Sequence, residues 1–223
     1  MRAEEIHLAF VIADLCGYTA LTEAHGNIDA ARAVTRYADI AQAALQPSAR
    51  LIERVGDEVV IAAETAAAAV RTAVALREAI ESEDLFPTLR TGIHAGSVAV
   101  QGGKYFGRAL NLAARVAAHA RGGQILCTDG VRRDAGDLDG VTYRPLGSVQ
   151  FKNIVDPVPV FQVITRGDDR EPAWVDPVCR MQVRAESAPA RLPYAGITYY
   201  FCSFECAKTF AERPEGYVAA PSA

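Results

Sequence analysis

Two aspartates stand where their carboxylates could hold a divalent cation. Asp14 lies near the end of the apolar run Ile6–Leu15, which has the density of a buried strand. Asp57 follows Gly56 inside the β-branched run 51–63, which predicts a hairpin with Asp57 at its tip. Two carboxylates on such rigid elements can share Mg²⁺ or Mn²⁺ with substrate phosphates. Taken alone, each residue is more often a turn residue or a helix cap.

The elements that would position these carboxylates are strands mixed with helices. Strands are expected at 6–15, as a hairpin within 51–63, at 88–94, and near 124–127, 142–151 and 158–164, with helices from Thr19 and over 28–46, 65–83 and 107–120. Two helices on one face of a largely antiparallel sheet would bury these apolar stripes. The sequence therefore predicts an α+β fold, with a ferredoxin-like palm as the best match.

Composition narrows the class of protein. The 223 residues are 50% hydrophobic and 22% charged, which is ordinary for globular chains. A formal charge of −4 gives no broad basic surface for nucleic acid. His7 and Asp14 interrupt the N-terminal apolar run, unlike a secretory leader, and the alanine-rich stretch 65–76 is too short to span a membrane. Five cysteines, an odd number, favour reduced thiols and a cytoplasmic location.

A change in composition divides the chain into two domains. The last fifty residues hold eight of the aromatic side chains and three of the five cysteines. The polar, charged segment 166–172, which ends in proline, precedes them as an exposed linker would. We expect a large domain at 1–165, a linker at 166–173 and a small module at 174–223.

Six motifs in the large domain carry a family resemblance. They read FVIADLCGYT at 10–19, VGD at 55–57, GIHAG at 92–96, YFGRALNLAAR at 105–115, GQIL at 123–126 and GSVQFK at 147–152. In this order and spacing they resemble the motifs of class III adenylate/guanylate cyclase catalytic domains, over about residues 6–164. The resemblance implies an enzyme that converts a nucleoside triphosphate to a 3′,5′-cyclic nucleotide and pyrophosphate.

The resemblance also implies a role for individual residues. Two aspartates of this family hold two Mg²⁺ or Mn²⁺ ions, and Asp14 and Asp57 occupy those positions, with the backbone of Leu15 beside them. Backbone N–H groups of the following turn would wrap the triphosphate at a helix N-terminus, where anions are favoured. The implied triphosphate-binding residues are Cys16, Gly17, Tyr18, Thr19 and Lys152.

A helical pair supplies the implied catalytic groups. Asn111 and Arg115 are four residues apart and share one helix face, an arrangement that is usually only solvated. In the family the Asn orients the ribose and the Arg stabilises charge on the α-phosphate. The family works as antiparallel homodimers, so that Asp14 and Asp57 of one chain would meet Glu53, Lys104, Asn111, Arg115 and Lys152 of the other.

The base-recognition positions depart from the adenylate cyclase pattern. That pattern has Lys four residues before the second metal aspartate and Asp or Thr before the helical motif, whereas this chain has Glu53 and Lys104. Glu accepts from the guanine N–H groups and Lys donates to its O6, which predicts GTP over ATP. Two alternatives remain: Glu53 and Lys104 pair with each other and leave a weak cyclase or a nucleotide-binding scaffold, or Arg54 or Arg108 lies near the base and ATP is used.

The small module contains the cysteine pattern C-x₂₂-C-x₃-C, formed by Cys179, Cys202 and Cys206. Residues 174–218 resemble the YHS domain, although Arg180 stands where that family usually has Gly and Phe201 replaces the histidine of its name. Three thiols can bind a soft ion such as Zn²⁺ or Cu⁺, but no fourth ligand is apparent. Equally, the thiols can be small buried hydrophobes.

The fusion itself suggests a regulatory hypothesis. Metal occupancy or redox state of the module would modulate the cyclase dimer. In a third alternative, the protein is chiefly a metal or redox sensor, and an inactive cyclase fold serves as its dimerising scaffold. The cysteines Cys16 and Cys127 and the histidines His94 and His119 are expected to be structural.

Overall fold

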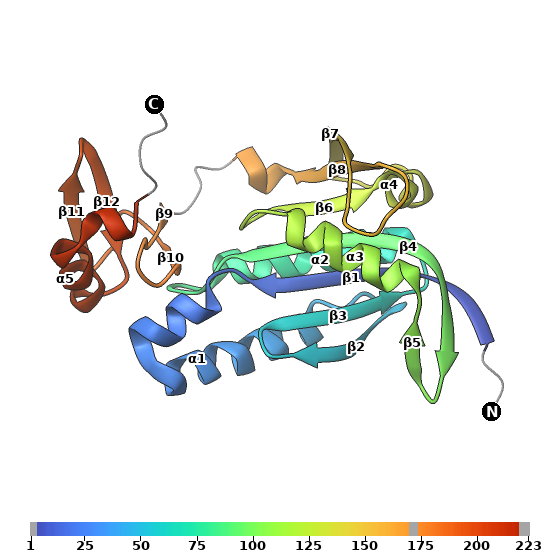
Figure 1. Ribbon diagram of the computed structural model, residues 1–223, viewed down its shortest axis with the longest axis horizontal. Helices are drawn as coiled ribbons and strands as arrows, with labels where there is room; N and C mark the ends of the chain where they lie inside the picture. Colours follow the sequence, from blue (N-terminus) through green and yellow to red (C-terminus); the bar gives the residue numbers. More distant parts are fainter. Residues whose placement is uncertain (1–3, 170–173, 219–223) are drawn as a thin grey trace.

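A computed structural model describes residues 4–169 and 174–218 of the chain. Its larger part is an eight-stranded sheet in the order β2-β3-β1-β4-β6-β8-β7, with β5 paired to β4 (Figure 1). The strands are β1 (Glu4–Leu15), β2 (Ala49–Val55), β3 (Glu58–Ala63), β4 (Leu89–Gln101), β5 (Lys104–Phe106), β6 (Ile125–Thr128), β7 (Val141–Val149) and β8 (Val158–Thr165). The helices are α1 (Tyr18–Ala43), α2 (Ala66–Ser82), α3 (Arg108–His119) and α4 (Asp129–Ala135).

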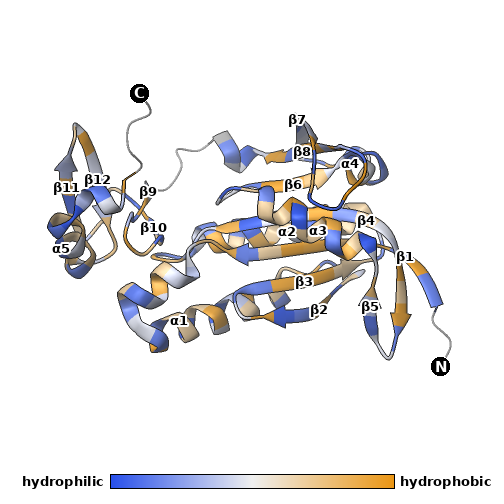
Figure 2. Ribbon diagram, viewed as in Figure 1, coloured by the Kyte–Doolittle hydropathy of each residue, from blue (hydrophilic) through white to orange (hydrophobic). Residues whose placement is uncertain are grey.

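Strand β1 is the centre of the sheet because it pairs antiparallel with both β3 and β4. Its side chains alternate between two hydrophobic clusters, as the period of a strand requires. Val11 and its neighbours two residues away pack with α1, α2 and α4, whereas Phe10 and Ile12 pack with α3. Figure 2 shows the resulting apolar character of β1, β3 and β4 through the middle of the sheet.

Helices α1 and α2 share one face of the sheet, as expected, and α3 covers the opposite face, which was not expected. Helix α3 connects β4 to β6, the one parallel pair among the described strands. A parallel pair needs a crossover connection, and this crossover carries α3 to the face opposite α1 and α2. The α+β class and the antiparallel-rich cyclase palm are confirmed.

Helix α3 can approach β4 closely because residue 92 is glycine. A Cβ atom at Gly92 would overlap backbone atoms of Ala117 and Ala113. The alanines Ala109, Ala113 and Ala117 form the helix face that contacts the sheet. The small side chains on both surfaces thus fix the position of α3 and of the polar residues on its other face.

Three local elements differ from the sequence-based expectation. Strand β4 continues through the segment with Gly96 and turns at Gly102 and Gly103, whose φ angles are 59° and 74°, into β5. Helix α4 was not predicted, because its seven residues include a glycine and four charged side chains. Helix α1 runs from Tyr18, with a break at Gly26, where φ is 82° and ψ is 170°.

The end of the large domain is held by an ion pair. After β8 comes a 3₁₀ turn, η1 (Arg166–Asp169), in which Asp168 accepts hydrogen bonds from both Nη atoms of Arg77, each 3.0 Å long. Arg77 is only 2% exposed and also donates to the Thr165 hydroxyl at 2.6 Å. Residues 166–169 are therefore fixed to α2 and β8, and residues 170–173 of the expected linker lie outside the described residues.

The small module consists of two short hairpins and one helix. Its elements are β9 (Trp174–Val175), β10 (Gln182–Val183), β11 (Ala190–Tyr194), β12 (Ile197–Phe201), α5 (Phe204–Glu212) and a 3₁₀ turn, η2 (Pro214–Gly216). Its core gathers Phe201, Phe210 and the three cysteines. The module lies beside the start of α1 (Figure 1). Among the described helices, none is long and apolar enough to cross a membrane.

Candidate active site and a cysteine–histidine cluster

The two expected metal-binding aspartates lie at the same end of the sheet. Asp14 is the second-to-last residue of β1, and Asp57 is the second residue of the two-residue turn between β2 and β3. The turn is anchored on β1, because the Leu15 amide donates to the Asp57 carbonyl at 3.2 Å. Gly56 supplies the positive φ angle, 59°, that a tight hairpin turn requires. The structure thus brings the two carboxylates together.

The electrostatics of Asp14 are those of a carboxylate in a crowded site. Burial raises its pKa, and the neighbouring Asp57 carboxylate raises it further. Arg90, the cross-strand partner of Asp14 on β4, opposes this: its Nε and Nη2 atoms lie 2.7 and 2.5 Å from Asp14 Oδ2. Neighbouring carboxylates that disfavour each other's charge are stabilised by a cation between them.

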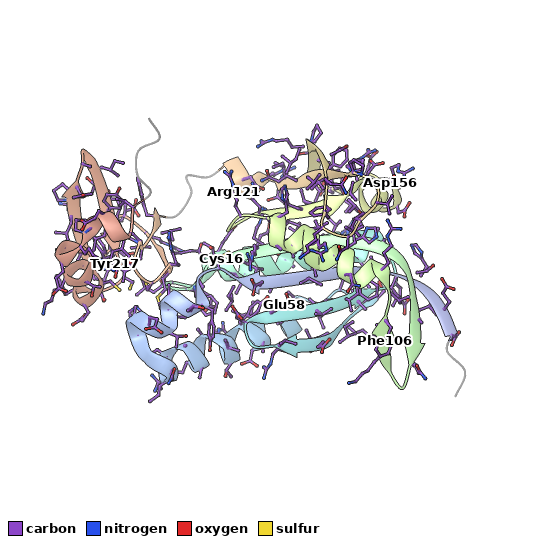
Figure 3. The ribbon with its side chains drawn as sticks, in the orientation of Figure 1. Cys16, Glu58, Phe106, Arg121, Asp156 and Tyr217 are labelled. Carbon is purple, nitrogen blue, oxygen red and sulfur yellow. The ribbon has the colours of Figure 1, made fainter. Side chains whose placement is uncertain are left out.

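The segment that would bind the triphosphate follows immediately. The Cys16 amide donates to the Thr88 carbonyl at 2.7 Å, and Gly17 adopts a left-handed φ of 81° before α1 begins at Tyr18. The N–H groups in the first turn of a helix have no partner within the helix, so this turn presents donors to an anion. Figure 3 shows Cys16 at the end of the sheet that faces the small module.

The expected catalytic pair on α3 is accessible. Asn111 is exposed and Arg115 is half-buried, on the side of α3 away from the alanine face. Lys152 is exposed in the loop after β7. Within residues 4–169 and 174–218, no hydrogen bond or ion pair joins any of these three side chains to Asp14 or Asp57. The structure of a single chain therefore does not assemble the whole expected site.

The expected base-recognition residue Lys104 is also apart from the aspartates. Lys104 begins β5, which pairs with the far end of β4, and Asp14 pairs with Arg90 near the start of β4. A strand rises about 3.3 Å per residue, so the eleven residues from Arg90 to Gln101 place Lys104 about 36 Å from Asp14 along the sheet. In Figure 3, Cys16 and Phe106 lie toward opposite ends of the sheet.

Glu53 is exposed on β2, where a register shift between Leu51 and Glu53 disturbs the pairing with β3. Such a bulge re-aims the side chains beside it. No ion pair between Glu53 and Lys104 occurs within the described part of the chain, although the sequence left that pairing open. Arg54 and Arg108 are likewise exposed.

A second cluster of chemically active side chains lies in the small module. The sulfur of Cys202 is 3.3 Å from that of Cys179 and 3.6 Å from that of Cys206. The Nε2 atom of His25, which belongs to α1 of the large domain, lies 3.4 Å from the Cys202 sulfur and 3.6 Å from the Cys206 sulfur. The four potential ligand atoms all lie within 4.8 Å of one another.

The cysteines are held in place by a buried carboxylate. Asp176 is fully buried, and its two oxygens accept from the amides of Val178 and Cys202, each at 2.8 Å. Cys206 lies in the first turn of α5, and hydrogen bonds from Cys179 and Cys202 lower its pKa. A thiolate is the form in which cysteine binds a metal, and the hydrogen bonds that Cys179 shares with Cys202 and Cys206, together with burial, raise the pKa of Cys179.

His25 was not identified from the sequence, where the module lacked a fourth ligand. It lies inside an ordinary helical pattern and is 154 residues or more before the three cysteines of the module, so neither spacing nor periodicity connects it to those cysteines. The one local signal is Gly26, which breaks α1 directly after the histidine. One of the two histidines expected to be structural, His94, is half-buried and hydrogen-bonded to Thr128 Oγ1 at 2.9 Å.

Comparison with known proteins agrees with both parts of the chain. Residues 174–220 match the sequence model of the YHS domain. The chain is 31% identical over 164 residues to a pH-sensitive adenylate cyclase of Mycobacterium tuberculosis (strain CDC 1551 / Oshkosh), covering 72% of this chain and 41% of that relative. It is 36% identical over 105 residues to an adenylate cyclase of Streptomyces griseus, covering 47% and 26%. The chain thus spans well under half of each of these two relatives.

Solved structures share the fold of the large domain. An adenylate/guanylate cyclase/hydrolase from Silicibacter pomeroyi has a TM-score of 0.65 at 28% identity, covering 73% of this chain and 99% of that one. The adenylyl cyclase CyaB from P. aeruginosa has a TM-score of 0.66 at 21% identity, covering 77% and 100%. The large domain is therefore a nucleotidyl cyclase fold. The chain combines the catalytic-domain fold of the class III adenylate/guanylate cyclases with a C-terminal YHS domain.

Proposed function

We propose that the large domain is a nucleotidyl cyclase that acts as a homodimer on a nucleoside triphosphate. The observation that carries the proposal is the placement of Asp14 and Asp57 at one end of the sheet, directly before a turn with free N–H donors. Such a pair of carboxylates beside a phosphate-binding turn suits in-line transfer at a phosphorus atom.

The residues present fit two divalent cations. Asp14 and Asp57 provide hard oxygen ligands, and the carbonyl of Leu15 lies between them in the chain, which is the donor set that Mg²⁺ and Mn²⁺ prefer. Bound there, the ions would supply activation of the ribose 3′-hydroxyl and stabilisation of the phosphate charge. Arg90 holds Asp14 in position by donating to its Oδ2 atom.

A second copy of the chain would complete the site. Asn111 would orient the ribose and Arg115 would stabilise charge at the α-phosphate, with Lys152 on the leaving pyrophosphate. The separation of about 36 Å between Asp14 and Lys104 along the sheet prevents one chain from providing both ends of the site. An antiparallel dimer would bring the two ends together twice, in two equivalent sites.

We propose GTP as the preferred substrate. Glu53 is positioned to accept from the guanine N–H groups and Lys104 to donate to O6, while no ion pair between them appears in the described residues. The relatives named above are adenylate cyclases, which favours ATP, so both nucleotides must be compared. Polar readout of this kind discriminates by about 10⁴-fold, enough for a clear result.

The experiment incubates the purified protein with GTP or with ATP in Mn²⁺ and measures each cyclic product. Asp57→Ala should lower the rate at least about 100-fold, since it removes a metal ligand. The matched control is Asp137→Ala, which changes an exposed aspartate away from the site. Cyclic AMP as the main product would retain the enzyme and refute the base assignment. No product from either nucleotide would favour the scaffold alternative.

A mixing experiment tests the dimer. Asp57→Ala and Asn111→Ala should each be inactive alone, because each leaves both sites of its homodimer incomplete. Mixed in equal amounts they should recover about a quarter of the normal rate, since half of the dimers are then mixed and each has one intact site. No recovery after subunit exchange would contradict a shared site.

A further inference from the structure

The cysteine cluster of the YHS module is incomplete within the module itself. Cys179, Cys202 and Cys206 offer three sulfurs, and the fourth ligand atom near them is Nε2 of His25 in the large domain. The four ligand atoms come from two separate cores: the cysteines belong to the cluster around Phe210, and His25 follows Ala24, which packs against that cluster. Two domains thus converge on one point.

The spacing of these atoms fits one tetrahedral ion. Zinc binds sulfur at about 2.3 Å and imidazole nitrogen at about 2.0–2.1 Å, which places tetrahedral ligand atoms about 3.5–3.8 Å apart. The sulfur of Cys202 lies 3.3 and 3.6 Å from the other two sulfurs, and His25 Nε2 lies 3.4 and 3.6 Å from the sulfurs of Cys202 and Cys206. Three thiolates and one imidazole are a known structural zinc set.

We propose that His25, Cys179, Cys202 and Cys206 bind one Zn²⁺ ion, and that this ion fastens the YHS module to the first segment of α1. The donor set selects a soft or borderline ion such as Zn²⁺ over Mg²⁺ or Ca²⁺. The buried Asp176 carboxylate organises the loops of Cys179 and Cys202, as outer partners of metal ligands do. This zinc site shares no ligand with the proposed nucleotide site.

The kink in α1 directs His25 toward the module. Gly26 leaves helical geometry, so residues 18–25 form a separate helical segment that ends at the histidine. This segment begins directly after Gly17, and seven residues of helix span about 10 Å. The ion therefore holds one end of a short rigid rod whose other end is the triphosphate turn.

A second contact links the same two places. Arg180, the residue after Cys179, lies against Gly17 so closely that a Cβ atom at position 17 would overlap its Cβ and Cγ atoms. Arg180 has a left-handed φ of 67°, a conformation natural for the glycine that the YHS family usually has there. Both proposed ligands are therefore linked to the triphosphate turn at Gly17. His25 is linked through residues 18–25 of α1, and Cys179 is linked through Arg180.

The test measures Zn²⁺ binding to the full chain under reducing conditions, by competition with a chelator. The wild-type protein should bind one Zn²⁺ per chain. His25→Ala should weaken the affinity by about 100-fold or more, since loss of a direct ligand costs more than the 10–100-fold typical of outer partners. His25→Cys should stay within about tenfold of wild type, because four thiolates also close a zinc site.

The matched control is His7→Ala, which removes an exposed histidine on β1. It should leave Zn²⁺ affinity unchanged. Equal affinity in His25→Ala and wild type would overturn the proposal, because the module would then hold the ion alone. Absence of Zn²⁺ binding in the wild type would also overturn it.

A second readout follows the link between the domains. Amide hydrogen exchange in residues 18–25 should rise when Zn²⁺ is removed from the wild type, while exchange in the later part of α1, residues 34–43, stays constant. In His25→Ala the exchange in 18–25 should be high with and without Zn²⁺. Protection that ignores Zn²⁺ in the wild type would refute the fastening role.

Discussion

The guanidinium of Arg90 grips one oxygen of the Asp14 carboxylate, with Nε at 2.7 Å and Nη2 at 2.5 Å from Oδ2. The two residues are direct cross-strand partners on β1 and β4, so the contact is fixed by the register of the sheet. It places a cation beside the carboxylate pair before any metal binds. The charge balance of this end of the sheet therefore depends on Arg90.

Replacement of Arg90 by Ala should destabilise the metal-free protein by about 1–2 kcal/mol, because the repulsion between Asp14 and Asp57 is then uncompensated. Added Mn²⁺ should raise the melting temperature of the variant more than that of the wild type. Thermal unfolding with and without Mn²⁺ measures both effects. Arg184→Ala, which breaks an exposed ion pair with Asp84, serves as the control. Equal Mn²⁺ shifts in wild type and Arg90→Ala would contradict this charge balance.

Asp168→Asn should lower the free energy of unfolding by about 3 kcal/mol, the low end of the range for breaking a buried pair. Arg77 is 2% exposed and would lose the nearer of its two carboxylate partners, keeping Glu81 at 3.5 Å, whereas the Asp168 side chain is 22% exposed. Burial alone would raise the pKa of Asp168, but hydrogen bonds from the Thr165 amide and Arg77 lower it. This stabilisation is therefore present above the unfolded-state pKa and is lost as pH falls below about 4. Urea denaturation at pH 7 and pH 3 checks both statements; a loss that is the same at both pH values would oppose them.

His94 should make the fold sensitive to mild acid. Burial, with Arg108 and His7 nearby, lowers its pKa from 6.5 to about 4. Between these values the unfolded chain binds a proton that the folded chain does not, so stability falls as pH decreases. His94→Gln removes this proton-binding group. Between pH 7 and pH 5, the free energy of unfolding of the variant should therefore fall by about 1–2 kcal/mol less than that of the wild type. Parallel pH dependences in urea denaturation would show that His94 is not responsible.

Gly92→Ala should destabilise the large domain by about 1–3 kcal/mol or more, since the new methyl group would press on the backbone of α3. The control is Gly130→Ala in α4, where nothing lies within 4 Å of the added atom. That change should be neutral or stabilising by up to about 1 kcal/mol, as expected for Gly to Ala in a helix. Similar stabilities of the two variants would mean that the close approach of α3 is not required.

A charge exchange tests the base-recognition proposal. Glu53→Lys combined with Lys104→Asp gives this chain the two base-recognition residues of the adenylate cyclase pattern. The ratio of GTP to ATP turnover should fall by about 100-fold or more, because the hydrogen-bonding groups then match adenine. The ratio is measured from both cyclic products at subsaturating nucleotide. An unchanged ratio would place base recognition elsewhere, with Arg54 and Arg108 as the next residues to change.

Much of the fold could be predicted because its elements have local causes. The hairpin at Gly56 and Asp57 combines a turn signal with β-branched flanks, and α3 carries a regular alanine stripe. By contrast, the side of the sheet on which α3 packs depends on the crossover between β4 and β6. Long-range pairing of that kind has no signature in a single segment of sequence, so the placement of α3 on the opposite face was not predicted.

The candidate site residues also fall into those that local sequence predicts and those that depend on long-range packing. Asp14 and Asp57 were identified because strand ends and hairpin tips are visible in the sequence, and family motifs surround them. His25 was missed because its chemistry arises only where α1 meets a module that begins about 150 residues later. Its role depends on packing between two cores, which neither motif nor spacing encodes.

The YHS module has a second attachment that uses main-chain atoms and no metal. The Gln182 amide donates to the Phe86 carbonyl at 2.9 Å, and Met181 forms a bridge with Pro87. Loss of the ion would therefore leave the cysteines tethered near His25, at a high effective concentration set by this contact and by the covalent chain. Recapture of the histidine would be an intramolecular step. The response to metal would then reset at a rate independent of protein concentration, whatever the expression level of the chain.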